Sequence, residues 1–96
     1  MHELTGFQRD LLFVLSGIGT SNGQQLKREL QRTLDQSVLS GRIYSNLETL
    51  VEGGYVLKSE RDGRTNEYRL SSRGEEVIRG RFEWQRRQAD PSLVVK

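Results

Sequence analysis

Polar side chains that can recognise a base or hold a phosphate are concentrated in two stretches of this sequence, residues 39–52 and 61–65. In the first stretch Arg42 and Asn46 are four residues apart, which places them on one face if the stretch is helical. A guanidinium group fits the O6 and N7 atoms of guanine, and an asparagine amide fits the N7 atom and N6 amino group of adenine. We therefore predict a base-reading face whose members are Arg42, Asn46, Ser45, Ser40 and Thr49.

The second stretch holds two arginines around a tight turn. Asp62-Gly63 is a strong signal for a two-residue hairpin turn, so Arg61 and Arg64 are expected at its tip, within reach of a phosphate or the minor groove. Lys27 and Arg28 are weaker phosphate candidates, because Glu29 follows them directly. The alternative for both stretches is that these polar groups simply face solvent.

The composition excludes several other kinds of site. The 96 residues contain no Cys, which rules out disulfides, thiolate nucleophiles and cysteine-ligated metals. The one His is His2, so a metal site built on imidazoles or a Ser/His/Asp relay would depend on that single residue near the N-terminus. We therefore expect no enzyme activity, no metal and no cofactor.

The net charge is only +2, but eight Arg against five acidic residues in 61–87 concentrate positive charge in that part of the chain.

Three helices are predicted to position the first stretch. Apolar residues at three- and four-residue spacing predict a helix from about Gly6 to Ile18, with Thr5 and Gln8 as a capping box. Leu26, Leu30 and Leu34 predict a second helix, capped by Ser21 or Asn22 with Gln24 or Gln25 as the reciprocal partner. A third helix over residues 39–52 buries Ile43, Leu47 and Leu50 and stops at Gly53-Gly54.

A hairpin and a last helix follow. Residues 55–61 and 65–70 are rich in strand formers and predict the two strands that carry the arginine tip. Ser71 or Ser72 begins the last helix, with Ser72 and Glu75 spaced as a capping box, and the pattern runs to about Gln88 before Asp90-Pro91 ends it. Residues 91–96 are expected to be a frayed tail.

This order of elements predicts an α+β fold that is mainly α, a winged helix-turn-helix with an added C-terminal helix. We expect one compact unit: a DNA-binding region over residues 1–70, a dimerisation helix over 71–90 and a flexible tail over 91–96.

Three segments resemble the PadR family of winged-helix transcriptional regulators: LTGFQRDLLFVLSGI, GRIYSNLETLVEGGYV and RDGRTNEYRLSSRG. The family pattern of the third helix is matched by Gly41, Arg42, Ile43, Tyr44, Ser45, Leu47, Leu50 and Gly54, and that of the second hairpin strand by residues 68–74. The resemblance covers residues 4–88 and is greatest to short archaeal members with a single C-terminal helix. Ser45 stands where the family commonly has Pro, and Val38-Leu39 stands where a small hydroxylated cap is usual, so Ser37 and Ser40 both remain candidates for the cap.

The resemblance implies a phosphate contact by the Tyr44 hydroxyl, although Tyr44 also fits a tyrosine at the edge of the core. It further implies a homodimer. The last helix carries large apolar residues that little of the remaining chain can cover, which independently favours a two-fold partner. The predicted dimer interface comprises Phe7, Leu11, Val14, Val77, Ile78, Phe82 and Trp84. The alternative is that these residues fold back on their own core.

The function that these features favour is a homodimeric regulator, by default a repressor, that binds a pseudo-palindromic operator in double-stranded DNA. One alternative is a ligand sensor whose dimer interface holds an aromatic small-molecule effector near Trp84 and Phe82, with DNA affinity released when the effector binds. Another is a winged helix that serves replication, partition or protein binding. No stretch reaches the roughly 18 apolar residues of a membrane helix, and no secretory signal is recognisable, so we expect no membrane partner and a cytoplasmic location.

Overall fold

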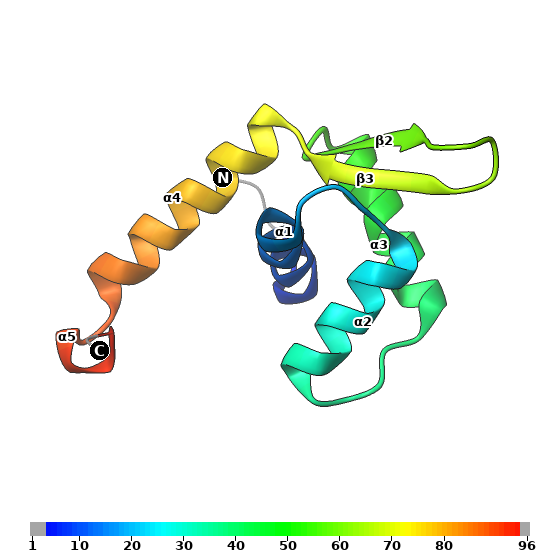
Figure 1. Cartoon of the computed structure of the whole chain (residues 1–96). Helices are drawn as coiled ribbons and strands as arrows, with labels where there is room; N and C mark the ends of the chain where they lie inside the picture. The colour runs from blue at the N-terminus through cyan, green and yellow to red at the C-terminus, as the bar shows by residue number, and fades with distance from the viewer. Residues whose placement is uncertain (1–3, 95–96) are drawn as a thin grey trace.

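The computed structural model describes residues 4–94 (Figure 1). The elements are α1 (Gly6–Ile18), β1 (Ser21–Asn22), α2 (Gly23–Leu34), α3 (Ser40–Glu52), β2 (Val56–Glu60), β3 (Asn66–Leu70), α4 (Ser72–Gln88) and α5 (Pro91–Val94). The predicted mainly helical winged helix-turn-helix is confirmed. His2, the one histidine, lies outside the described residues.

Two local capping boxes begin α1 and α2. The Thr5 hydroxyl accepts from the Gln8 N–H at 3.1 Å, and the Gln8 side chain accepts from the Thr5 N–H at 3.1 Å. Asn22 and Gln25 make the same exchange at the start of α2, at 2.9 and 2.8 Å. Of the predicted alternatives, Asn22 with Gln25 is therefore the capping pair, and both boxes satisfy backbone donors that a helix start leaves unpaired.

The sheet contains a short strand that the sequence analysis missed. Its strand order is β1-β3-β2, with both pairs antiparallel, so β3 is central. Ser21, considered above as a helix cap, is instead buried and pairs with Tyr68. This pairing ties the start of α2 to the hairpin.

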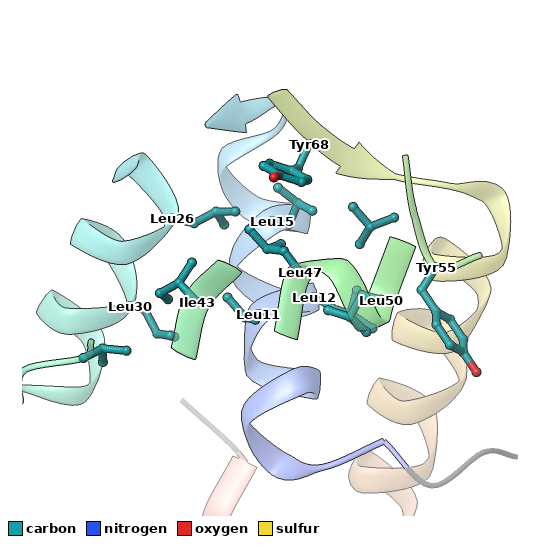
Figure 2. Packing of buried hydrophobic residues seen from close by; sticks show 12 residues of the cluster. Leu11, Leu12, Leu15, Leu26, Leu30, Ile43, Leu47, Leu50, Tyr55 and Tyr68 are labelled. Atoms are coloured by element: carbon teal, nitrogen blue, oxygen red, sulfur yellow. The ribbon is translucent and has the colours of Figure 1, made fainter. Parts of the chain in front are cut away.

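The core surrounds α1, which packs against α2, α3, α4 and β3 (Figures 1 and 2). Its members are Leu11, Leu12, Leu15, Leu26, Leu30, Val38, Ile43, Leu47, Leu50, Tyr55, Val56 and Tyr68. Ile18, the last residue of the apolar spacing that predicts α1, is 41% exposed, because α1 ends there and the chain turns away at Gly19 with φ +79°.

The N-terminus of α3 has no side-chain cap. Leu39 occupies the N-cap position. Neither Ser37 nor Ser40 takes that role. Ser40 lies in the first turn, where its hydroxyl accepts a hydrogen bond from Lys27 Nζ of α2 at 2.9 Å.

The start of α4 is anchored where α3 ends. Ser71 is the N-cap, and its hydroxyl accepts from the Gly74 N–H at 3.0 Å while donating to the Gly54 carbonyl at 2.6 Å. The Ser71 N–H donates to the Tyr55 carbonyl at 3.0 Å. The predicted Ser72–Glu75 capping box is therefore wrong, because the N-cap is Ser71, whose hydroxyl also bonds the Gly54 carbonyl just beyond α3.

From this anchor α4 extends away from the rest of the protein, and α5 lies at its far end (Figure 1). In the segment predicted to be a tail, residues 91–94 form the short helix α5. Asp90 caps the turn by accepting from the Ser92 N–H at 3.0 Å.

Candidate nucleic-acid interface

The face of α3 opposite the core is polar and exposed. Ile43, Leu47 and Leu50 are completely buried, as predicted. Arg42, Ser45 and Thr49, three of the predicted base-reading residues, are exposed. The Thr49 hydroxyl donates to the Ser45 carbonyl at 3.2 Å within the helix, which leaves its oxygen able to accept a further bond.

Arg42 lies against α1. Its guanidinium carbon is 3.9 Å from the centre of the Phe7 ring, within the range of a cation–π interaction. Among residues 4–94 its guanidinium takes part in no ion pair, so its N–H donors remain available to an outside acceptor.

Asn46, the other principal candidate, is already bonded within the protein. Its Oδ1 accepts from Gln8 Nε2 of α1 at 2.9 Å, and its Nδ2 donates to the Arg42 carbonyl at 2.8 Å. The side chain is partly buried. A bidentate contact with adenine would require breaking the bond to Gln8, so the geometry favours Asn46 as a link between α1 and α3.

The hairpin tip differs from the predicted two-residue turn. The Arg61 N–H donates to the Thr65 carbonyl at 2.8 Å, which leaves a three-residue loop of Asp62, Gly63 and Arg64. Asp62 Oδ1 accepts from the N–H groups of Arg64 and Thr65 at 3.2 and 3.1 Å, and these bonds lower the pKa of the Asp62 carboxyl. Gly63 adopts φ +84°, a conformation that suits glycine.

The two arginines of the tip have different surroundings. Arg61 lies 3.4 Å from the Glu67 carboxylate, so part of its charge is compensated within the hairpin. Arg64 is exposed and takes part in no ion pair within the described part of the chain. Arg64 is therefore the stronger phosphate candidate.

Arg64 and Tyr44 line the same cleft, although they are 20 positions apart in the sequence. The cleft has a volume of about 360 Å³, and its walls are Asn22, Gly23, Gln24, Tyr44, Arg64, Thr65 and Asn66. Tyr44 is 38% exposed and packs against the first turn of α2, where a Cβ atom at Gly23 would lie 2.5 Å from its hydroxyl oxygen. Two predicted phosphate ligands are thus brought together.

Sequence reasoning missed three residues of this cleft, one each from β1, α2 and β3: Asn22, Gln24 and Asn66. The glycine directly after the Asn22 cap was the available signal, since it is the position where an aromatic ring can approach the helix closely. Lys27 and Arg28, the weaker candidates, lie further along α2. Lys27 bonds Ser40, whereas Arg28 is exposed and has no ion pair among residues 4–94.

The residues predicted for a dimer interface fall into three groups. Leu11 is completely buried in the protein's own core, because its side of α1 faces α2 and α3, and it has no surface to offer a partner. Phe7, Val14, Val77 and Ile78 are half-buried against that core. Only Phe82 and Trp84, at 56% and 45% exposed, present large apolar surfaces to solvent.

Phe82 and Trp84 open onto different hollows of the surface. Phe82 lines one of about 620 Å³ between α1, β3 and α4, together with Phe13, Arg69 and Arg79. Trp84 lines another of about 560 Å³ along α4, where the Arg81 guanidinium carbon is 4.6 Å from the Trp84 ring centre. Within one protomer the two aromatic side chains therefore line separate hollows.

Within residues 4–94, no helix is both long and apolar enough to cross a membrane. The same residues contain no group of three or more His, Asp or Glu side chains arranged to hold a metal ion.

Residues 11–80 match the model of the transcriptional regulator PadR-like family. Among solved structures, the chain is similar to RosR of H. salinarum, with 42% identity and a TM-score of 0.85 over 93% of this chain and 82% of RosR. None of the curated proteins matches its sequence.

Two more distant structures share the fold. One is an E. coli MarR variant complexed with operator DNA, with 21% identity and a TM-score of 0.71 over 81% of this chain and 53% of MarR. The other is a winged-helix DNA-binding protein from STIV, with 16% identity and a TM-score of 0.75 over 88% of this chain and 92% of that protein. The family match and the similarity to RosR together show that this chain belongs to the PadR-like family of transcriptional regulators.

Proposed function

We propose that this protein regulates transcription by binding double-stranded DNA, with α3 in the major groove and the tip of the β2–β3 hairpin on the flanking backbone. The observation that carries the proposal is the cleft shared by Tyr44 and Arg64, next to the exposed polar face of α3. A helix fits the major groove, and a phenol and a guanidinium beside it can hold a phosphate of the same duplex. The operator complex of MarR, which shares this fold, supports the assignment.

Within this interface the residues take different roles. Arg42, Ser45 and Thr49 face base edges. Ser40 and Lys27 form a hydrogen-bonded pair at the start of α3. Tyr44 and Arg64 bind phosphates of the DNA backbone. Arg61 and Arg28 add positive charge at the periphery. Asn46 positions α3 on α1 through Gln8 rather than reading a base.

The proposal also includes a homodimer formed through α4. Phe82 and Trp84 leave apolar surface exposed on a helix that extends from the rest of the protein, and a second copy is the occupant that a two-fold axis supplies (Figure 1). A two-fold dimer presents two α3 helices to successive major grooves, roughly 34–36 Å apart, which predicts a pseudo-palindromic site. The same dimer would cover the hollows beside Phe82 and Trp84, so the proposal contains no small-molecule effector.

Repression is the mode we propose, because a dimer seated across two grooves excludes other proteins from the same DNA. The protein would act in the cytoplasm together with the DNA that it regulates.

Fluorescence anisotropy tests the proposal, using duplexes from the protein's own promoter region and scrambled duplexes of equal length, over a salt series. We expect site-selective binding with two chains per duplex and an affinity that falls with salt. Equal and weak binding to both sets of duplexes would contradict it.

A further inference from the structure

Glu48 is an acidic residue on the outward face of α3, in the surface that we propose meets DNA. It follows Tyr44 by four residues and Ser45 by three, so it shares a face of the helix with both. Its side chain is 48% exposed. A carboxylate in this position is repelled by the phosphates of an approaching duplex, so its presence requires local compensation of its charge.

Lys58 of β2 supplies that compensation. Its Nζ lies 2.6 Å from Glu48 Oε2, and this hydrogen bond raises the pKa of Lys58. The pair has no net charge, so it does not repel DNA as an isolated carboxylate would. Glu48 Oε1 has no hydrogen-bond partner within residues 4–94 and remains an acceptor on the surface of α3.

The major groove offers two donors to such an acceptor, the N4 amino group of cytosine and the N6 amino group of adenine. The adenine amino group lies next to the N7 lone pair, which repels a carboxylate. The cytosine amino group has a C–H group as its neighbour. A carboxylate oxygen in the groove therefore favours cytosine over adenine, and it rejects the acceptors of guanine and thymine.

We propose that Glu48 is a specificity-determining residue that selects a C·G base pair by accepting a hydrogen bond from the cytosine N4 amino group, while Lys58 neutralises its charge. This inference rests on the proposed function, because it requires α3 to lie in the major groove. It adds a base preference that Arg42, Ser45 and Thr49 do not provide, since none of them carries a purely accepting group.

The test compares three proteins in binding-site selection from randomised duplexes, followed by anisotropy on the selected sites: wild type, Glu48→Gln and Glu52→Gln. Each variant loses one negative charge from the exposed side of α3, and Glu52 takes part in no ion pair within the described chain, so Glu52→Gln is the matched control. Thermal melting by circular dichroism confirms that the variants are folded.

We expect the wild type and Glu52→Gln to prefer C at one position of each half-site, by about five- to tenfold over other bases. Glu48→Gln should prefer A at that position, because a glutamine amide can accept from N6 and donate to N7 of adenine. A structural role for Glu48 would not change the preferred base.

Two results would overturn the inference, and they differ in what else they affect. If Glu48→Gln and Glu52→Gln both bind every duplex more tightly with unchanged base preference, Glu48 acts only through its charge, and the proposed regulator role stands. If the wild type selects no sequence at all, the proposed function and this inference both fail.

Discussion

The guanidinium carbon of Arg42 lies 3.9 Å from the centre of the Phe7 ring, so a side chain of α3 that we propose contacts DNA packs against α1. Stacking on an aromatic ring leaves the N–H donors of arginine available at the edge of the guanidinium plane. It also restricts a long side chain before any ligand is bound, which lowers the entropic cost of ordering it in a complex. We infer that α1 prepares Arg42 for contact with a base.

Replacing Arg42 tests this directly. Arg42→Ala should relax base preference and cost about 1–3 kcal/mol of binding free energy at the preferred duplex. Phe7→Leu keeps an apolar side chain but removes the ring, and should cost only about 0.5–1 kcal/mol. Anisotropy on the preferred duplex and on single-base variants measures both. Equal losses on all duplexes for Arg42→Ala would assign Arg42 to the phosphate backbone instead.

Gly23→Ala should weaken binding to every duplex by displacing Tyr44. A Cβ atom at Gly23 would lie 2.5 Å from the Tyr44 hydroxyl oxygen, and the phenol end of that side chain can move where the backbone cannot. We therefore expect the fold to survive, with an unchanged circular dichroism spectrum. Tyr44→Phe is the matched comparison, because it removes the hydroxyl without moving the ring. Wild-type affinity in both variants would remove Tyr44 from the interface.

Arg64→Ala should lower the slope of log affinity against log salt by about one unit, because one fewer counterion is released from DNA. Arg61→Ala should lower it less, since the Glu67 carboxylate lies 3.4 Å from the Arg61 guanidinium and already compensates part of its charge. Titrations at four or more salt concentrations give the slopes. An unchanged slope for Arg64→Ala would place the hairpin tip outside the interface.

Acidification should loosen the hairpin tip through Asp62. The Arg64 and Thr65 N–H groups lower the pKa of the Asp62 carboxyl in the folded state, so the charged carboxylate stabilises the tip. That stabilisation is complete above the ordinary aspartate pKa of about 3.9, and it is lost as the pH falls from there through the lowered folded pKa. Amide NMR shifts of Arg64 and Thr65 against pH report it. In Asp62→Asn this acid transition should be absent; its persistence would implicate another group.

Local signals in the sequence predicted much of this fold. The boxes Thr5–Gln8 and Asn22–Gln25 depend on groups three residues apart, and the buried faces of the helices follow from apolar spacing alone. Contacts between distant residues were not predictable in this way. β1 exists because Ser21 pairs with Tyr68, 47 positions later by residue number.

The candidate site shows the same division. Exposure of Arg42, Ser45 and Thr49 follows from helix periodicity. The hydrogen bond from Gln8 to Asn46, however, depends on how closely α1 approaches α3. The cleft that Tyr44 and Arg64 line depends on where the hairpin lies relative to α2. Leu11 was misassigned because its spacing fits a helix stripe but does not say which partner covers that stripe.

Trp84→Ala should shift the protein toward monomer in sedimentation equilibrium, because it removes a large apolar side chain that is 45% exposed on α4. Phe82→Ala should act in the same direction. Leu57→Ala is the matched control, since Leu57 is a similarly exposed apolar residue on β2, away from α4. A dimer that persists in both α4 variants would move the interface elsewhere.

The anchor between α3 and α4 bears on how such a regulator can evolve. The Ser71 hydroxyl bonds the Gly54 carbonyl, and a Cβ atom at Gly74 would collide with the Tyr55 carbonyl, so α4 leaves the end of α3 at one angle. In a two-fold assembly that angle sets the distance between half-sites. The outward side chains of α3 take no part in the anchor. Substitutions there can change which bases are preferred while the spacing of the operator is inherited unchanged.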